Sequence, residues 1–99
     1  MQTREQYILG KIAEEASEVA QRAIKARDYG LDEVQEGKTT NNAERLVEEF
    51  YDLVSRLREL ESLNPLLVLS SEGAEASFYG KAEQREKYLQ LSRTLGRTE

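Results

Sequence analysis

Residues 13–20 of this 99-residue chain read AEEASEVA, and residues 47–54 read VEEFYDLV. Each stretch sets three carboxylates among apolar residues, and in each stretch two of them lie three residues apart: Glu15 and Glu18 in the first, Glu49 and Asp52 in the second. Because residues three apart lie on the same side of a helix, the two stretches predict helices that each carry neighbouring carboxylates. The question they raise is what balances the charge.

The apolar pattern around these stretches predicts an all-α fold. From about Thr3 to Arg27, apolar residues recur at spacings of three and four, which is typical of an amphipathic helix: Ile8, Leu9, Ile12, Ala16, Val19, Ala20, Ala23 and Ile24. A second stripe continues to about Glu61 and consists of Leu46, Phe50, Leu53, Val54, Leu57 and Leu60. We expect Phe50 to lie in the core because it belongs to this stripe.

Turn and capping residues set the boundaries of these helices. Gly30 and Gly37 lie in a polar stretch that predicts a loop of about a dozen residues. Asn41, three residues before Glu44, predicts a capping box at the start of the second helix. Its end is expected at residues 61–64, because a residue before proline avoids the helical conformation and Asn64 precedes Pro65.

The C-terminal third gives a weaker signal. Residues 66–69 fit either a short buried helix or extended chain, since periodicity cannot decide over so few residues. From Lys81 to about Leu95 a third helical pattern returns, and it closes with Gly96, a residue suited to the position after a helix end. No repeat and no alternating strand pattern is present, so we expect a single all-α domain over residues 1–99.

Composition narrows the possible functions. A net charge of −5 argues against a general electrostatic grip on nucleic acid or on an anionic membrane. The chain has no cysteine and no histidine, so carboxylates are its available metal ligands, and oxygen ligands suit Mg²⁺ or Mn²⁺. No stretch approaches the 18–20 apolar residues of a membrane span, and we expect a cytoplasmic protein, in the host cytoplasm if phage-encoded.

The four carboxylates permit two interpretations. If the helices pack antiparallel, Glu15, Glu18, Glu49 and Asp52 converge across a partly buried cleft, where they would repel one another unless a cation were bound. Alternatively, the glutamates simply lie on solvated helix faces, since glutamate is a good helix former. The residues alone leave both interpretations open.

The order EExxE, loop, ExxD resembles the signature of the all-α nucleoside triphosphate pyrophosphohydrolases. The chain is most similar to phage-type MazG-like members, through LGKIAEEASEVAQRAIKARDYGLDEVQ, TNNAERLVEEFYDLV and KYLQLSRTLG. The resemblance implies a MazG-like helical fold whose four-helix bundle is completed by oligomerisation, as a homodimer or homotetramer. Thirty residues separate Glu18 from Glu49, a long spacing that fits an insertion at residues 30–40.

This resemblance implies a Mg²⁺-dependent enzyme, with Mn²⁺ as a possible substitute, that cleaves an NTP or dNTP to the monophosphate and pyrophosphate. The implied metal ligands are Glu15, Glu18, Glu49 and Asp52. Glu14 or Glu18 would accept the proton from the attacking water. The alternative is a non-catalytic binding protein on the same scaffold, a phage sponge that sequesters a nucleotide-derived immune signal.

A nucleotide site also needs groups for the phosphates and the base. The candidate phosphate-binding residues are Arg22, Lys25, Lys38, Lys81 and Lys87, each of which also fits an ordinary surface cation. The candidate base-stacking residues are Tyr29, Tyr51, Phe78 and Tyr79.

Overall fold

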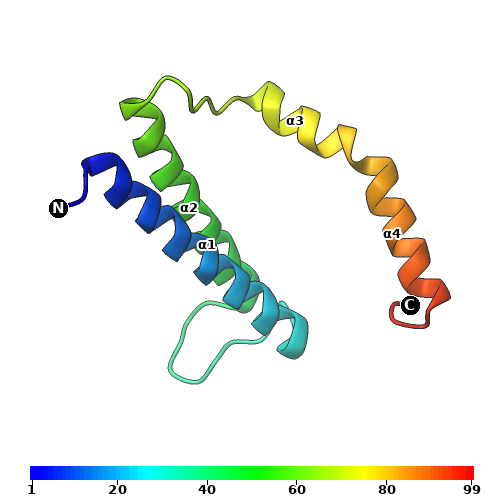
Figure 1. The fold of residues 1–99 in the computed structure, drawn as a ribbon. Coiled ribbons are helices and arrows are strands. Elements are labelled where there is room, and N and C mark those ends of the chain that lie inside the picture. The colour runs from blue at the N-terminus through cyan, green and yellow to red at the C-terminus, as the bar shows by residue number, and fades with distance from the viewer. The chain divides into compact units, whose positions relative to one another are not determined.

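The computed structural model describes residues 1–99 and contains four helices and no strand (Figure 1). Helices α1 (Arg4–Tyr29) and α2 (Asn42–Leu63) belong to a compact unit formed by residues 1–67. Helices α3 (Ser71–Gly80) and α4 (Ala82–Thr94) belong to a second unit, residues 68–99. The all-α class is therefore confirmed, while a single domain over residues 1–99 stays a prediction.

Both long helices begin at capping boxes. In α1 the Thr3 hydroxyl accepts from the Gln6 backbone N–H at 3.1 Å, and the Gln6 side chain accepts from the Thr3 N–H at 2.8 Å. The expected box at α2 is present, with the Glu44 N–H donating to Asn41 Oδ1 at 2.8 Å. These contacts satisfy backbone donors that have no partner within the helix.

The ends of these helices follow from the local sequence. Helix α1 runs to Tyr29 and is terminated by Gly30, whose φ of 97° lies in the region that favours glycine. Helix α2 ends at Leu63, and Asn64 before Pro65 is extended as expected, with φ −140°. The Asn64 side chain also donates to Glu5 Oε1 at 2.9 Å, which joins the end of α2 to the start of α1.

The loop between α1 and α2 is tied to the start of α2. Asn42 is 1% exposed, and its side-chain amide donates to the Gly30 carbonyl at 2.8 Å. Its backbone N–H donates to the Glu33 carbonyl at 3.0 Å, and Arg45 Nη1 donates to Gln35 Oε1 at 2.5 Å. An isolated bridge pairs Val34 with Asn41. Although it lacks regular secondary structure, the loop holds α2 in register with α1.

Helices α1 and α2 lie side by side and run antiparallel (Figure 1). The buried apolar residues of this unit are Ile8, Ala26 and Leu60. The expectation that Phe50 lies in the core is wrong for the single chain, because Phe50 is 49% exposed. One partner helix covers only one side of the apolar arc of α2, and Phe50 lies on the side that stays open.

The second unit consists of two consecutive short helices. Residues 66–69 are not helical, which resolves that ambiguity, and α3 follows with the Ser70 hydroxyl accepting from the Gly73 N–H at 2.9 Å. Helix α4 ends at Thr94, and Gly96, the glycine expected just after the helix end, has a φ of 73°. No residue of α3 or α4 is buried, and none of the helices in the structure is long and apolar enough to cross a bilayer.

Candidate metal centre

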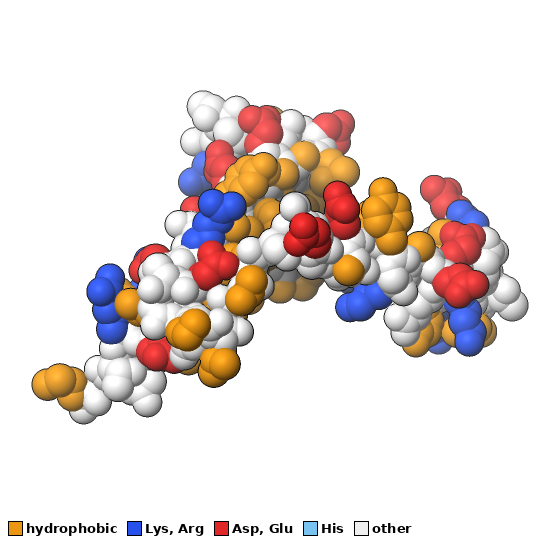
Figure 2. Space-filling model, turned by 90° about the horizontal axis from the view of Figure 1, so that it is seen from above, with side chains coloured by type: hydrophobic (Ala, Val, Ile, Leu, Met, Phe, Trp, Pro, Cys, Tyr) orange, Lys and Arg blue, Asp and Glu red, His pale blue; other side chains and the backbone are white.

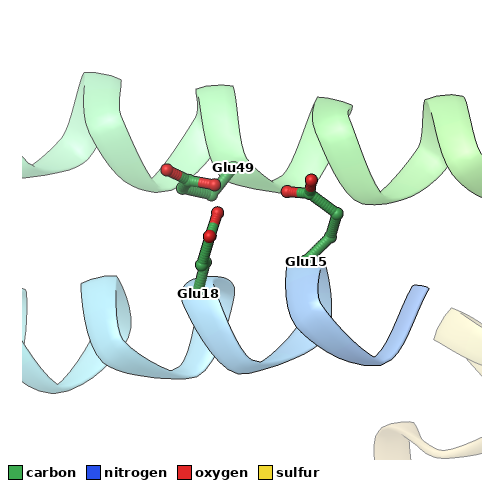
Figure 3. Close-up of side chains that lie close together, drawn as sticks. All are labelled: Glu15, Glu18 and Glu49. Carbon is green, nitrogen blue, oxygen red and sulfur yellow. The ribbon is translucent and has the colours of Figure 1, made fainter. Parts of the chain in front are cut away.

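Three carboxylates from two helices meet in the middle of the α1–α2 pair (Figure 3). Glu15 and Glu18 lie one turn apart on α1, and Glu49 extends from the facing turn of α2. One oxygen of each side chain lies within 4.8 Å of the oxygens of the other two. The antiparallel packing thus brings together three of the four expected ligands.

Two of these carboxylates are partly removed from solvent. Glu15 and Glu49 are half-buried, whereas Glu18 is exposed. The Oε2 atoms of Glu15 and Glu49 are both buried without a hydrogen-bond partner. Buried polar atoms usually have partners, so these two oxygens distinguish the cluster from carboxylates on a fully solvated helix face.

The environment raises the pKa of both half-buried carboxyls above the ordinary value. For Glu15, burial raises the pKa first, and the nearby carboxylates of Glu18 and Asp52 raise it further. For Glu49, burial is again the leading cause, followed by Glu18 and then Asp52 and Glu15. Burial and the neighbouring negative charges both disfavour the charged form of these carboxyls. A cation bound between them would stabilise the charged form.

Asp52 and Glu14 lie outside the group of three. Asp52 is exposed, yet it is close enough to raise the pKa values of Glu15 and Glu49. Glu14 forms an exposed ion pair with Lys11 Nζ at 3.0 Å. Asp52 is therefore within electrostatic reach of the cluster, and Glu14 is engaged elsewhere.

Arg56 is a cationic residue near the cluster that the sequence analysis did not identify. It lies on the side of the cluster away from the α1–α2 loop. The charge of Arg56 partly offsets the rise in the pKa values of Lys11 and Glu15, so Arg56 lies near both in the helix pair. Its Nη1 also pairs with Glu59 Oε1 at 2.8 Å. The signal that indicates Arg56 is its position, four residues after Asp52 on the carboxylate side of α2.

Two arginines lie towards the loop end of the helix pair. Because Glu18 of α1 lies near Glu49 of α2 and the helices run antiparallel, we expect Arg22 to lie at the level of Arg45. Arg22 lies one turn beyond Glu18 in α1, and Arg45 lies one turn before Glu49 in α2. Arg22 is half-buried, and its Nη1 atom is buried without a hydrogen-bond partner. Positively charged residues therefore lie on both sides of the three carboxylates along the helix pair: Arg56 on one side, and Arg22 and Arg45 on the other.

The other expected phosphate-binding residues are more dispersed. Lys25 is half-buried on α1, and Lys38 is exposed in the loop. Lys81 and Lys87 are exposed residues of the second unit. Among the five candidates, Arg22 alone combines a place next to the carboxylates with a buried donor atom that has no partner.

The expected base-stacking residues are all at the surface. Tyr29 and Tyr51 are each exposed, on α1 and α2. Phe78 and Tyr79 of α3 form an edge-to-face pair with ring centroids 5.3 Å apart, and the Arg85 guanidinium lies 4.6 Å from the Phe78 centroid.

The three carboxylates fit a hard divalent cation. Mg²⁺ binds oxygens at about 2.0–2.1 Å, so opposite ligands lie roughly 4.2 Å apart. Adjacent ligands of an octahedral Mg²⁺ lie closer, at about 2.9 Å. The three glutamate oxygens lie within 4.8 Å of one another, so they would have to draw together around the ion. The all-oxygen donor set and the two unpartnered oxygens fit Mg²⁺ or Mn²⁺ better than a softer metal.

Comparison of the chain with protein-family models, curated proteins and solved structures finds no match.

Proposed function

We propose that this chain is a Mg²⁺-dependent nucleoside triphosphate pyrophosphohydrolase that cleaves an NTP or dNTP to the monophosphate and pyrophosphate. The observation that carries the proposal is the convergence of Glu15, Glu18 and Glu49, with two buried carboxylate oxygens that lack donors. A cation held there would face solvent through the exposed Glu18, where a charged substrate can approach.

In this proposal the three glutamates hold the metal, and Asp52 joins them when its side chain turns inward. When bound, Mg²⁺ neutralises phosphate charge and activates water for attack at phosphorus. Glu18 is the better proton acceptor of the two candidates, because it belongs to the cluster and is exposed. Glu14 is held by Lys11 outside the cluster.

Arg22 is the leading candidate for binding the phosphates. A guanidinium forms paired hydrogen bonds with phosphate oxygens, and the unpartnered Nη1 of Arg22 lacks such an acceptor. Lys25 follows it by three residues on α1 and can add charge at the same end of the site. For the base, Tyr51 is an exposed ring on α2, the helix that carries Glu49.

The position of Asp52 favours a second candidate function. Asp52 lies outside the group of three, so the ligand set that converges is smaller than the set implied by the motif. A site with fewer metal ligands can hold a nucleotide without placing the attacking water. The second candidate is therefore a nucleotide-binding sponge on the same scaffold.

The proposal includes a homodimer or homotetramer. A two-helix unit is too small to enclose a triphosphate, and helical sites of this kind are built between facing helices of a bundle. We place the protein among those that act on small nucleotides and assign it no nucleic-acid partner.

One experiment separates the two candidates. The purified protein is incubated with Mg²⁺ and a panel of NTPs, dNTPs and cyclic nucleotides, and the products are identified by chromatography and mass spectrometry. Monophosphate and pyrophosphate establish the enzyme and identify its substrate. A nucleotide that binds tightly and is recovered unchanged establishes the sponge.

The residue test compares two glutamate-to-glutamine substitutions at adjacent positions of α2. Glu49→Gln removes a member of the cluster, and we expect turnover to fall by at least 100-fold with helix content retained. Glu48→Gln makes the same chemical change at an exposed position outside the cluster and should keep activity within about twofold. Equal activity of the two variants would exclude the assigned metal site.

A further inference from the structure

Three basic residues at the loop end of the α1–α2 pair differ from the other basic residues of the chain. On the face shown in Figure 2, basic and acidic side chains are interspersed. The half-buried basic residues all lie on α1 or α2, and they are Lys11, Arg22, Lys25, Arg45 and Arg56. Lys11 pairs with Glu14 at 3.0 Å, and Arg56 pairs with Glu59 at 2.8 Å. The other three form no ion pair, although a half-buried charge is usually compensated.

The register of the helix pair places these three residues near one another. Glu18 of α1 lies near Glu49 of α2 (Figure 3). Because the helices run antiparallel, four residues forward on α1 and four residues back on α2 lead to Arg22 and Arg45 at one level. Lys25 lies two turns after Glu18, on the same side of α1 as that carboxylate. We call Arg22, Lys25 and Arg45 the loop-end basic site.

The loop-end basic site has hydrogen-bond donors that are available to an anion. Arg22 Nη1 is buried without a partner, and the Lys25 side chain forms no hydrogen bond. Arg45 donates from Nη1 to Gln35 Oε1 at 2.5 Å, and the other N–H groups of its guanidinium make no such contact. A buried donor without an acceptor lowers stability, so an oxyanion bound here would stabilise the helix pair.

The acidic residues of the loop do not neutralise this site. Asp28 pairs with the adjacent Arg27 at 3.0 Å, and Glu33 Oε1 accepts from Asn42 Nδ2 at 3.3 Å. The other acidic residues of the loop are exposed and form no ion pair. The counter-charge for the loop-end basic site therefore has to come from outside the loop.

The number and type of these cations match a group of two linked phosphates. A terminal phosphate carries a charge of about −1.5 to −2, so a single phosphate leaves part of the charge of three cations unbalanced. A second phosphate linked to the first balances the remainder. Guanidinium groups also bind phosphate oxygens in pairs, and the site contains two of them.

The two ends of the carboxylate cluster are therefore different. On the side away from the loop, Lys11 and Arg56 already have glutamate partners. On the side towards the loop, Arg22 and Arg45 have none. A chain of phosphates held by a metal at the cluster would find unpaired cations in one direction only, towards the loop.

We propose that the loop-end basic site binds the two terminal phosphates of the substrate, so that the substrate lies along the helix pair with its pyrophosphate end towards the loop. The identity of the substrate rests on the proposed function, and Arg45 is a further residue of that site. In the reaction, water attacks the α-phosphorus and gives a proton to Glu18. The bond from this phosphorus to the α–β bridging oxygen breaks, and its electron pair leaves with the pyrophosphate that the loop-end basic site holds.

The test titrates the full-length chain with inorganic pyrophosphate in EDTA by isothermal titration calorimetry, so that no metal contributes to binding. We expect pyrophosphate to bind at least about tenfold more tightly than inorganic phosphate, because it carries more charge. Arg45→Gln should weaken pyrophosphate binding about tenfold, since a charge-assisted hydrogen bond is lost. Arg58→Gln is the matched control, because Arg58 is exposed on the other side of α2, and it should keep the affinity within about twofold.

A second variant keeps the test decisive if Arg45→Gln disturbs the loop through the lost contact with Gln35. The Lys25 side chain has no hydrogen bond or ion pair, so Lys25→Gln should retain the helix content, which circular dichroism measures, and should also weaken pyrophosphate binding. Glu49→Gln should bind pyrophosphate at least as tightly as the wild type, because a nearby negative charge is removed. This last result separates the loop-end basic site from the metal site.

The inference is overturned if the wild type does not bind pyrophosphate in EDTA, or if Arg45→Gln and Lys25→Gln bind it as tightly as the wild type. Nucleotide turnover together with either result would leave the proposed function standing without this site. Conversely, the expected pattern of pyrophosphate binding in a protein that turns over no nucleotide would support the site and contradict the proposed enzyme.

Discussion

At the scale of single residues, the dominant feature is the electrostatic cost of Glu15 and Glu49. Each has a pKa above the ordinary value, with burial as the leading cause and neighbouring carboxylates adding to it. The folded chain therefore holds protons on these groups at a higher pH than the unfolded chain does. Folding is favoured by this contribution at low pH, and the contribution is lost as pH rises through the folded-state pKa values.

We therefore expect the metal-free protein to gain stability as the pH falls from neutral towards 4.5, the ordinary pKa of a glutamate. The measurement is the urea midpoint as a function of pH in EDTA. Because Glu49→Gln removes one of the raised groups, it should be more stable than the wild type at pH 7.5 and show a shallower pH dependence. Parallel pH profiles for the two proteins would contradict this account.

The same residues predict how a metal acts on stability. A ligand that binds only the folded state stabilises it in proportion to its occupancy of the site. At pH 7.5, millimolar Mg²⁺ should raise the thermal midpoint of the wild type, with a smaller rise for Glu49→Gln than for the matched Glu48→Gln. Equal shifts in both variants would mean that the ion binds away from the cluster.

At the scale of the elements, caps and loop contacts set the position of α2. Asn41 caps its first turn, and Asn42 fastens the loop to Gly30 at the end of α1. Glu49 lies two turns further along the same helix, so its place opposite Glu18 depends on this start. A shift of α2 by one residue would rotate Glu49 by about 100° around the helix axis and away from α1.

Removing the cap provides a prediction at this scale. Asn41→Ala should lower the free energy of unfolding by about 1 kcal/mol, because the Glu44 N–H loses its acceptor. Asn41→Asp keeps an oxygen at that position and should retain most of the stability. Urea denaturation of the three proteins makes the comparison, and an alanine variant as stable as the aspartate variant would show that the cap contributes nothing.

At the scale of the whole molecule, the fold of one chain leaves much apolar surface exposed. Ile8, Ala26 and Leu60 form a small core, and α3 and α4 contain no buried residue. If association completes the fold, unfolding is coupled to dissociation, and the thermal midpoint must rise with protein concentration. We expect a rise of several degrees between about 2 and 200 µM, and a midpoint independent of concentration would exclude association as a source of stability.

The predictability of the fold differed between elements for identifiable reasons. The start of α2 was predictable because Asn41 and Glu44 make a local contact, and its end because Pro65 restricts Asn64. Phe50 was assigned to the core because apolar periodicity shows which residues avoid water, without showing which side of the helix its neighbour covers. Residues 66–69 were ambiguous because four apolar residues fit a helix and an extended segment equally well.

Within the candidate site, the glutamates were predictable from helical spacing, whereas Arg56 and the unpartnered atoms were not. The closeness of Arg56 to Lys11 depends on the register of two antiparallel helices, which no local pattern specifies. Whether an oxygen of Glu15 or a nitrogen of Arg22 finds a partner depends on all the surrounding side chains.

The sequence by itself determined the all-α class, the helix boundaries set by caps, Gly96 and Pro65, and the presence of carboxylate pairs at helical spacing. These properties depend on interactions within a few residues of the chain. The tertiary structure alone decided that Glu15, Glu18 and Glu49 converge while Asp52 stays outside, and that Phe50 remains exposed. Those outcomes follow from how α1 and α2 pack, since the register and facing sides of two helices depend on contacts between residues distant in the sequence.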